Sequence, residues 1–335
     1  MKALLVEKWQ PFKNLKVKEH PIPKPKKQEY LIKIRAAGLS FATNLVVQGK
    51  YQVKPPLPFI PGTEIAGEIA STDSGQKHFF EGQRVCAVVD YGGLAEYACA
   101  HVTNIFPIPD ELSYEKAITF TNTYATSLAA LSWSHLLNLR KNQTLLVHGA
   151  TGGVGSAAVE IAKAQRAKVI AAVSSPKKII AAEAFGADQV ILNKPASFKK
   201  KIMTLTNNEG VDAVFDPIGG EVFTESIRCL KPEGRIIPIG FASGSIPSIP
   251  ANLLLVKNIT VCGLNMGLYF GWGPVDDREK YKPKMDHLMD QLFDLYLNGK
   301  INPKVSNTFK LSEANDAMNL ILNQKTIGRI SIKFE

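Results

Sequence analysis

The segment around residues 144–164 constrains the fold of this chain more than any other feature. Residues 144–148 are typical of a buried strand, glycines follow at positions 149, 152, 153 and 155, and a run of small residues typical of a helix comes next. Glycine allows a tight turn and lets backbone N–H groups approach a pyrophosphate, and the helix N-terminus adds a favourable partial charge. The spacing is G-x-x-G-x-x-G rather than G-x-G-x-x-G, so the prediction of a dinucleotide site depends on the context of the loop.

That context is supplied by strands and helices that alternate after the loop. Residues 155–165 place small and apolar side chains on one helical face. Ser175-Pro176 is typical of a helix start, with Ser as the N-cap and Pro at the first helical position. Alternating βαβ units of this length indicate a parallel sheet that is covered on both faces. The predicted strands are residues 144–148, 168–173, 189–192, 212–215, 235–239 and 259–264.

The rest of the chain has a different pattern, and a length of 335 residues suggests two domains. The first third is β-rich, with short runs at residues 31–35 and 85–89 set between Gly and Pro. A helix is expected over residues 283–298 and a terminal strand over residues 329–333. We therefore predict an α/β fold, with a Rossmann-type doubly wound parallel sheet in residues 123–266. A second, β-rich domain is expected to combine residues 1–122 and 267–335.

Charge and hydropathy limit the partners of this chain. It has 40 Lys and Arg against 30 Asp and Glu, a net charge of +10, which favours anionic partners such as a phosphorylated cofactor, an acidic substrate, nucleic acid or a membrane surface. The basic stretches 13–27 and 199–201 lack the interleaved aromatic residues of a surface that stacks single strands, so nucleic-acid binding is not expected. We expect a cytoplasmic protein without a membrane span, because no run of about 18 apolar residues and no secretory signal pattern is present.

Cysteine usage argues against a structural metal site. The chain has four cysteines, Cys86, Cys99, Cys229 and Cys262, with no C-x-x-C pair and no His at ligand spacing. A disulfide framework is also not expected in a chain whose apolar content of 45% suffices for a large core. We interpret the four as small buried hydrophobic residues.

The end of the second strand in the α/β region indicates which cofactor binds. An NAD site usually places Asp or Glu there to hold the ribose 2′-hydroxyl. Here the chain has Ser174, Ser175, Lys177 and Lys178 instead, and hydroxyl and ammonium groups suit a 2′-phosphate. The sequence therefore predicts NADPH as the cofactor. The alternative is that Ser175 only caps a helix and that the lysines are solvated.

Several short motifs together resemble a known family. They are residues 61–67 (PGTEIAG), 92–97 (GGLAEY), 106–110 (FPIPD), the glycine loop, 185–188 (FGAD), 216–220 (DPIGG) and 234–244. With them the whole chain resembles the zinc-independent quinone oxidoreductases, the zeta-crystallin-like branch of the medium-chain dehydrogenase/reductase superfamily. The resemblance implies a GroES-like domain packed on a Rossmann domain, with the active site in the cleft between them. It also implies a homodimer that reduces quinones with NADPH.

Two positions within this resemblance argue against a catalytic metal. The zinc alcohol dehydrogenases of the sister branch have Cys at the position of Ser40 and His at the position of Thr63. A hydroxyl is a poor neutral ligand compared with thiolate or imidazole. Without a Lewis acid, hydride transfer requires acceptors that are already electrophilic, such as quinones, enones and conjugated alkenals. No metal site is therefore expected.

The resemblance also implies cofactor-binding residues. Asn193 stands where the family often has a Tyr near the 2′-phosphate, and Thr126 matches a threonine beside the nicotinamide. Strand ends should line the nicotinamide pocket, as expected for an open parallel sheet. Arg329 is expected to reach the cofactor phosphates, and the alternative is an ordinary surface arginine. The full predicted set is Gly152, Gly153, Val154, Gly155, Ser174, Ser175, Lys178, Asn193, Gly240, Phe241, Ala242, Leu264 and Arg329, with Thr126 as a catalytic residue.

For the substrate, the informative residue is Tyr51 in Gly49-Lys50-Tyr51. Related enoyl-thioester reductases have a Gly-x-Tyr here, and the phenol of Tyr51 is suited to protonate a developing enolate or quinol oxygen. The alternative is that Tyr51 is only an aromatic wall of the pocket. His148, at the end of a core strand, is interpreted as a satisfied buried histidine rather than a catalyst. The other predicted substrate-facing residues are Phe41, Tyr124, Leu264, Asn265 and Met266.

These observations predict direct hydride transfer from NADPH to a quinone or a similar activated carbonyl or alkene, with the proton supplied by Tyr51 or solvent. An alternative within the superfamily is an enoyl-thioester or enone reductase, for which excess positive charge would help to bind an acyl-CoA phosphate. A third hypothesis, from another class, is an RNA-binding or structural crystallin-like protein.

Overall fold

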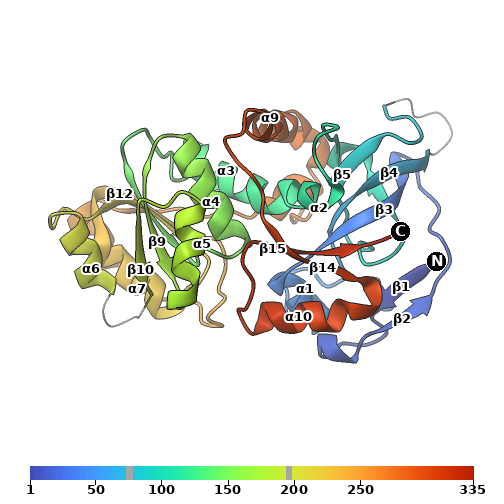
Figure 1. The fold of residues 1–335 in the computed structure, drawn as a ribbon, viewed down its shortest axis with the longest axis horizontal. Coiled ribbons are helices and arrows are strands. Elements are labelled where there is room, and N and C mark those ends of the chain that lie inside the picture. The colour runs from blue at the N-terminus through green and yellow to red at the C-terminus, as the bar shows by residue number, and fades with distance from the viewer. Residues whose placement is uncertain (73–77, 194–197) are drawn as a thin grey trace. The chain divides into compact units, whose positions relative to one another are not determined.

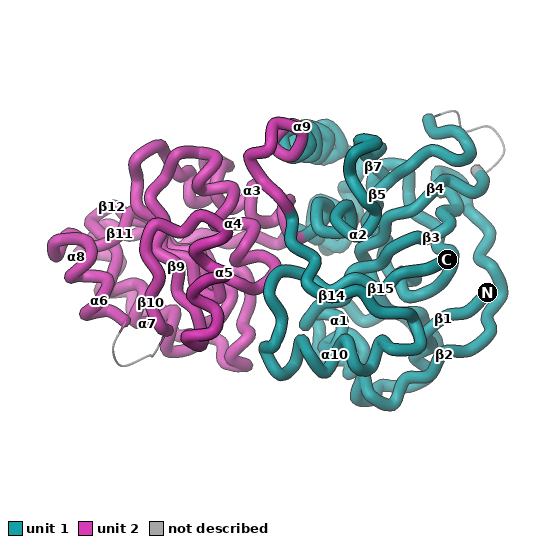
Figure 2. Tube along the Cα trace, viewed as in Figure 1, with its two compact units in different colours: residues 1–122, 266–293, 303–335 teal, residues 123–265, 294–302 magenta. Residues whose placement is uncertain are grey.

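The computed structural model describes residues 1–72, 78–193 and 198–335. Its contacts divide the chain into two compact units (Figure 2). Unit 1 consists of Met1–Asn122, Met266–Phe293 and Pro303–Glu335, and unit 2 of Thr123–Asn265 and Asp294–Asn302.

Unit 2 is built on a 6-stranded sheet in which every neighbouring pair is parallel. The strand order is β10-β9-β8-β11-β12-β13, so the order reverses beside the central strand β8. Ligands of open α/β sheets bind at the carboxyl ends of the strands at such a reversal. The strands are β8 (Thr144–His148), β9 (Lys168–Val173), β10 (Gln189–Leu192), β11 (Val211–Asp216), β12 (Leu230–Pro238) and β13 (Thr260–Val261).

Helices cover both faces of this sheet, which confirms the predicted doubly wound fold. In Figure 1, α4 and α5 lie on one face, and α6 and α7 on the other. The core of the second face includes Phe198, Val214 and Phe223, all buried. The helices of this unit are α3 (Ala125–Ser132), α4 (Gly153–Ala164), α5 (Ile179–Ala184), α6 (Phe198–Leu205), α7 (Gly220–Cys229) and α8 (Ala251–Lys257), and a 3₁₀ turn, η4 (Pro176–Lys178), precedes α5.

Unit 1 contains a 7-stranded sheet with the order β14-β15-β3-β4-β5-β7, and β6 also pairs with β3. Its core includes Tyr30, Ile32 and Ile65. The C-terminal strand β15 pairs antiparallel with β3, with Ser331 opposite Gly38, so the end of the chain joins the first sheet. The strands are β1 (Lys2–Leu5), β2 (Lys16–Glu19), β3 (Glu29–Leu39), β4 (Glu64–Thr72), β5 (Arg84–Val88), β6 (Tyr97–His101), β7 (Ile105–Pro107), β14 (Val305–Lys310) and β15 (Arg329–Lys333).

Two helices of unit 1 begin after serines that cap them. The Ser40 hydroxyl accepts a hydrogen bond from the backbone N–H of Thr43, and Ser113 caps its helix in the same way through Lys116. The helical elements are α1 (Phe41–Val47), α2 (Tyr114–Ala117), α9 (Arg278–Leu297), which ends in unit 2, and α10 (Ala314–Leu322), with the short turns η1 (Phe12–Asn14), η2 (Val102–Asn104), η3 (Phe120–Tyr124), η5 (Met266–Phe270) and η6 (Leu311–Glu313). Among the residues that the structure describes, no helix combines the length and the apolar character needed to cross a membrane.

Three segments differ from the prediction. The strand expected over residues 259–264 pairs only at Thr260–Val261, where β12 offers a partner. Helix α9 begins at Arg278 instead of residue 283, and the Asp276 carboxylate accepts a hydrogen bond from the Arg278 N–H at this end of the helix. Asp294–Asn302 packs with unit 2 rather than unit 1, and the Asn302 N–H lies 3.3 Å from a carboxylate oxygen of Glu160.

Candidate functional site

The glycine loop of unit 2 is a tight turn that joins β8 to α4. Gly149 has a φ of +55°, and the Gly152 N–H donates to its carbonyl oxygen at 2.8 Å. A Cβ atom at Gly155 would lie 2.2 Å from that same oxygen, so only glycine lets the helix start against the turn. Gly152 is the N-cap of α4, and Gly153 and Val154 form its first turn. The arrangement points the N-terminus of a 12-residue helix out of the carboxyl edge of the sheet, where it suits a pyrophosphate.

The loops after β11 and β12 lie beside the glycine loop. A Cβ at Gly149 would be 3.3 Å from the ring of Pro217 in the first of these loops. The Ala242 N–H in the second donates to the Pro217 carbonyl oxygen at 3.1 Å, and a Cβ at Gly219 would meet Phe241 at 2.7 Å. Gly240, Phe241 and Ala242 are therefore gathered at the switch point of the sheet. Leu264, half-buried, follows β13 at the sheet edge.

The buried Asp216 organises the loop after β11. Its carboxylate accepts hydrogen bonds from the backbone N–H groups of Ile218 at 2.7 Å and Gly219 at 3.1 Å. Burial raises the pKa of Asp216 to about 6, and the two N–H donors act against this rise. Asp216 thus shapes the backbone of the switch point and points inward.

The end of β9 presents the predicted 2′-phosphate residues. Ser174 is exposed and Ser175 half-buried, and Ser175 stands at the N-cap position of η4 without a side-chain capping hydrogen bond. Lys178 is half-buried, and burial lowers its pKa. Among the described residues, the side-chain oxygen of Asn193 is buried without a hydrogen-bond partner. These groups and the glycine cradle fit a phosphorylated dinucleotide.

Two further predicted residues of unit 2 are buried at the start of α3. Thr126 is 7% exposed and lies in the first turn of the helix. Tyr124 is 2% exposed, and its hydroxyl donates to a carboxylate oxygen of Glu160 on α4. The polar end of Tyr124 is therefore used in helix packing. Asn265, the last predicted residue of this unit, is exposed.

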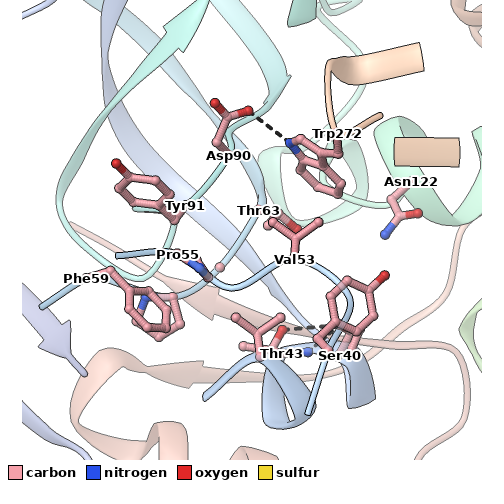
Figure 3. A pocket seen from close by; sticks show the side chains of 15 residues that line it. Ser40, Thr43, Val53, Pro55, Phe59, Thr63, Asp90, Tyr91, Asn122 and Trp272 are labelled. Atoms are coloured by element: carbon pink, nitrogen blue, oxygen red, sulfur yellow. Dashed lines mark hydrogen bonds between the residues drawn. The ribbon is translucent and has the colours of Figure 1, made fainter. Parts of the chain in front are cut away.

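Unit 1 contains a pocket that encloses about 60 Å³. In Figure 3, Tyr91 and Phe59 appear on one side of the pocket, Trp272 and Asn122 on the other, and Thr63 between them. Among the described residues that line it, none carries a positive charge. The lining consists of Ser40, Ala42, Thr43, Val46, Tyr51, Val53, Pro55, Phe59, Pro61, Gly62, Thr63, Asp90, Tyr91, Asn122 and Trp272.

Tyr51 lines this pocket as a protonated phenol. Burial, and then the negative charge of Glu64, raise the pKa of Tyr51 above its usual value. Glu64 is 2% exposed and is fixed by the Asn122 amide, which donates at 2.6 Å, and by the guanidinium of Arg329. At neutral pH Tyr51 can therefore donate a hydrogen bond or a proton into the pocket.

Ser40 and Thr63 line the same pocket. They stand at the positions where the zinc alcohol dehydrogenases have metal ligands. The Ser40 hydroxyl already accepts from the Thr43 N–H at 3.3 Å and lies 3.2 Å from the Thr43 hydroxyl. In the ranges 1–72, 78–193 and 198–335, no three His, Cys, Asp or Glu side chains gather as a metal site would require. The donor set of this pocket does not fit a catalytic zinc ion.

The remaining predicted residues lie in different surroundings. Phe41 is the first residue of α1, 37% exposed, and is not part of the pocket lining. Met266 is buried beside a smaller, water-sized cavity that it shares with Thr63 and Trp272. The side chain of Arg329 is 11% exposed and its guanidinium pairs with Glu64, so it is not an ordinary surface arginine. That Arg329 reaches the cofactor phosphates stays a prediction.

Two sets of residues were expected to be buried and structural. His148 is 0% exposed, its Nε2 lies 2.7 Å from the Ser226 hydroxyl, and burial lowers its pKa to about 3. Its Nδ1 has no hydrogen-bond partner among the described residues, so the histidine is buried but only partly satisfied. The four cysteines are free thiols, of which Cys99 is half-buried and the others buried.

Sequence reasoning missed the large aromatic and polar side chains of the pocket wall, which are Phe59, Asp90, Tyr91, Asn122 and Trp272. Asp90 and Tyr91 directly follow the predicted strand 85–89, so the position at a strand end was a usable signal. Trp272 lies between two glycines far along the chain, where nothing in the local pattern indicates a pocket.

Two family models match the two regions. Residues 26–110 match the alcohol dehydrogenase GroES-like domain, and residues 153–287 match the family described as zinc-binding dehydrogenase. The first confirms the predicted GroES-like domain. The second begins at Gly153, within the glycine loop, and includes the strands that follow the loop.

Relatives and solved structures cover the whole length. The chain is 37% identical over 304 residues to a quinone oxidoreductase-like protein 2 homolog of Nematostella vectensis, covering 90% of this chain and 80% of that protein. A mycobacterial protein solved in complex with NADPH superposes with a TM-score of 0.91 at 25% identity, covering 100% of both chains. A quinone oxidoreductase of Pseudomonas syringae does so with a TM-score of 0.90 at 25% identity, covering 99% of each chain. This chain therefore belongs to the quinone oxidoreductase-like branch of the medium-chain dehydrogenase/reductase superfamily of oxidoreductases.

Proposed function

We propose that this protein is an NADPH-dependent oxidoreductase that reduces uncharged quinones or similar conjugated carbonyl compounds. The observation that carries the proposal is the unit 1 pocket, in which the Tyr51 phenol and the hydroxyls of Ser40 and Thr63 meet aromatic walls without a cation. Quinone oxidoreductases among the relatives and structural neighbours support this choice of acceptor.

NADPH is proposed as the cofactor from residues of unit 2. The glycine loop and the N-terminus of α4 would hold the pyrophosphate, and Ser174, Ser175 and Lys178 the 2′-phosphate. The NADPH complex of the mycobacterial neighbour supports the same assignment. When bound, NADPH supplies a hydride for direct transfer, and Thr126 is proposed to orient the nicotinamide.

The chain itself orients the acceptor, excludes water and supplies a proton. A quinone or enone carbonyl in the unit 1 pocket would accept a hydrogen bond from the Tyr51 hydroxyl. As negative charge develops on that oxygen, Tyr51 can transfer its proton, since its phenol is kept protonated by burial and by Glu64. The phenolate formed would take a proton back from solvent.

Charge in and around the pocket favours uncharged acceptors. Asp90 is part of the lining and Glu64 lies beside it, while no described lining residue is cationic. Asp90 is paired with Arg278 and Glu64 with Arg329, so these negative charges are balanced, and no described lining residue is a cation that could hold an anionic substrate. A neutral quinone or enone needs no such partner.

Catalysis is proposed to proceed without zinc. Two hydroxyl side chains stand where thiolate and imidazole ligands would be needed, and one of them, Ser40, is used as a helix cap. Quinones are electrophilic enough to accept hydride without a Lewis acid.

An acceptor panel tests the proposal. NADPH oxidation is followed with one-ring and two-ring quinones, enones, enoyl-CoA thioesters and simple aldehydes, each with and without a chelator. We expect quinones and enones to be reduced faster than enoyl-CoA, aldehydes to be inert, and the chelator to have no effect. Preference for enoyl-CoA would favour the enoyl-thioester reductase alternative, and loss of activity with the chelator would contradict the zinc-independent mechanism.

A homodimer formed through unit 2 is also proposed. Strand β13 ends the sheet, and the outer groups of Thr260–Val261 have no strand beside them among the described residues. The neighbouring helix α8 exposes Leu255 and Val256, which are 78% and 73% exposed. Edge strands with apolar neighbours are prone to pair with another chain, and a two-fold axis would bury both edges at once.

A further inference from the structure

One wall of the unit 1 pocket is anchored to the rest of the pocket by a side-chain hydrogen bond. The Trp272 indole N–H donates to a carboxylate oxygen of Asp90 at 2.9 Å, as the dashed line in Figure 3 shows. Asp90 lies just after β5, whereas Trp272 lies in the turn between η5 and α9. Trp272 lines both the pocket and a smaller cavity that shares Thr63 and Asn122 with it.

The same carboxylate oxygen also receives a guanidinium group. Arg278, at the start of α9, places its Nη2 3.4 Å from Asp90 Oδ1 and its Nε 2.8 Å from the Asp276 carboxylate. Its side chain is only 12% exposed. The Arg278 guanidinium is therefore bound by two carboxylates. One of them, Asp90, is also the hydrogen-bond acceptor of the Trp272 indole. We name Asp90, Trp272 and Arg278 the Asp90 clamp.

Gly271 provides the space that the clamp needs. Its φ is +94°, a backbone conformation that favours glycine. A Cβ atom at this position would lie 2.3 Å from Nη2 of Arg278. The guanidinium thus packs directly on the backbone beside Trp272, which leaves little freedom for the residue that forms the wall.

A fixed indole has a direct consequence for an acceptor. The opposite side of the pocket is also aromatic, with Phe59 and Tyr91 in an edge-on arrangement at 6.5 Å between ring centroids (Figure 3). Planar conjugated rings pack well against such faces. Because the clamp holds Trp272 in place, the space between the two sides cannot widen freely to accept a larger ring system.

We propose that Trp272 is the specificity-determining wall of the acceptor pocket, and that Asp90 and Arg278 are positioning residues that set the upper size of the planar, uncharged acceptor. This inference rests on the proposed function, which places the acceptor in the unit 1 pocket. It adds to that function the residues of the Asp90 clamp and a selectivity for the size of the acceptor.

The test compares a one-ring quinone, 1,4-benzoquinone, with a three-ring quinone, 9,10-phenanthrenequinone, in the full chain with NADPH. We expect Trp272→Ala to raise the ratio of kcat/KM for the large over the small quinone by about tenfold. The change should lie in KM for the quinone, with KM for NADPH unchanged. Asp90→Leu and Arg278→Met should shift the ratio in the same direction by a smaller factor. Trp272→Phe, which keeps a ring but loses the N–H donor, should match them.

Matched controls separate the clamp from general effects of substitution. Lys18→Met removes an exposed ion pair of the same unit, between Lys18 and Glu7, and should leave the ratio unchanged. Trp133→Phe removes an indole from unit 2 and should do the same.

A fluorescence measurement reports on the clamp without turnover. In a Trp9→Phe, Trp133→Phe background Trp272 is the single remaining tryptophan of the three in the chain. Its emission anisotropy should fall on Asp90→Leu or Arg278→Met, because the indole is released, and should stay unchanged on Lys18→Met. Unchanged anisotropy in both clamp variants would contradict the positioning role.

The outcomes separate the size selection from the proposed function. If the wild-type protein reduces both quinones and Trp272→Ala leaves their ratio within about twofold, the size-selection inference is overturned while the proposed function stands. If the wild-type protein reduces neither quinone, the proposed function fails and the selectivity fails with it, while an anisotropy change would still support the clamp as a structural arrangement.

Discussion

At the scale of single residues, Tyr51 has the environment of a proton donor. Its phenol lines the pocket, and both burial and the charge of Glu64 raise its pKa. We predict that Tyr51→Phe lowers kcat for quinone reduction by about 10²-fold, within the range of general acid catalysis, and leaves KM for NADPH unchanged. Steady-state kinetics at neutral pH measure this effect.

Tyr91→Phe is the control for this prediction, because Tyr91 lines the same pocket but is exposed. It should retain nearly full kcat. Equal rates for wild type and Tyr51→Phe would show that Tyr51 is only an aromatic wall and that solvent provides the proton.

His148 makes a second prediction at this scale, on stability. Burial lowers its folded pKa to about 3, against about 6.5 in an unfolded chain. Between these values the unfolded chain binds a proton that the folded chain does not, so this residue's contribution makes stability rise with pH across that window. At pH 5 the loss relative to pH 7 is about 2 kcal/mol. Asp216, with a raised pKa of about 6, acts in the opposite direction below pH 6.

Because Asp216 opposes the effect of His148, the test compares the pH dependence of the unfolding free energy in the wild type with that in a His148 variant. His148→Gln keeps an N–H donor for Ser226 and should flatten the pH dependence of the unfolding free energy between pH 7 and 5, as measured by urea denaturation. The same substitution at the exposed His135 should leave the wild-type dependence intact. A His148→Gln protein with the wild-type pH profile would show that this histidine does not contribute.

At the scale of elements, the contact between β8 and α4 depends on one missing side chain. A methyl group at Gly155 would meet the carbonyl oxygen of Gly149 at 2.2 Å, so Gly155→Ala must push the helix off the turn. We expect a loss of stability of about 1–3 kcal/mol and weaker NADPH binding, measured by denaturation and calorimetry. Gly263→Ala is the control, since among the described residues other than its two chain neighbours no atom lies within 4 Å of the place its methyl group would take. Unchanged NADPH affinity in Gly155→Ala would contradict the pyrophosphate assignment.

The turn after β9 carries the prediction on cofactor choice. Lys178 is half-buried there, whereas its neighbour Lys177 is exposed. Lys178→Ala should raise KM for NADPH about tenfold or more, the value of a charge-assisted hydrogen bond, and barely change KM for NADH. Lys177→Ala should have little effect. A wild-type protein that prefers NADH would overturn the assignment.

The elements were predictable where local chemistry determines them. Strand β8, its glycine loop and α4 follow from residues adjacent in sequence, and the expected strand at residues 329–333 matches β15 in both bounds. The start of α9 was missed because Pro283, which lies inside the helix, itself resembles a helix start. The strand predicted over residues 259–264 is longer than β13, because an apolar run does not indicate how many of its residues pair with a neighbouring strand.

At the scale of the whole molecule, the least predictable features join distant parts of the chain. Glu64 and Arg329 are 265 positions apart and form a buried pair next to the unit 1 pocket. The absence of a side chain at Gly38 leaves room for this ion pair, since a Cβ atom at position 38 would lie 2.5 Å from a carboxylate oxygen of Glu64. Trp272 reaches Asp90 across 182 positions. The motifs indicated Tyr51, but only the folded chain shows which side chains surround it.

The last prediction concerns assembly of the whole molecule. If β13 and α8 form a two-fold interface, Leu255→Glu with Val256→Glu places charges in it, and the protein should sediment as a monomer where the wild type sediments as a dimer. The wild-type unfolding temperature should also rise with protein concentration, and that of the double variant should not. Ile180→Glu is the control, because Ile180 is equally apolar, 77% exposed, and lies on α5 beside β10 at the opposite edge of the sheet. It should remain dimeric, and if it becomes monomeric while the α8 variant stays dimeric, the interface lies at the β10 edge instead.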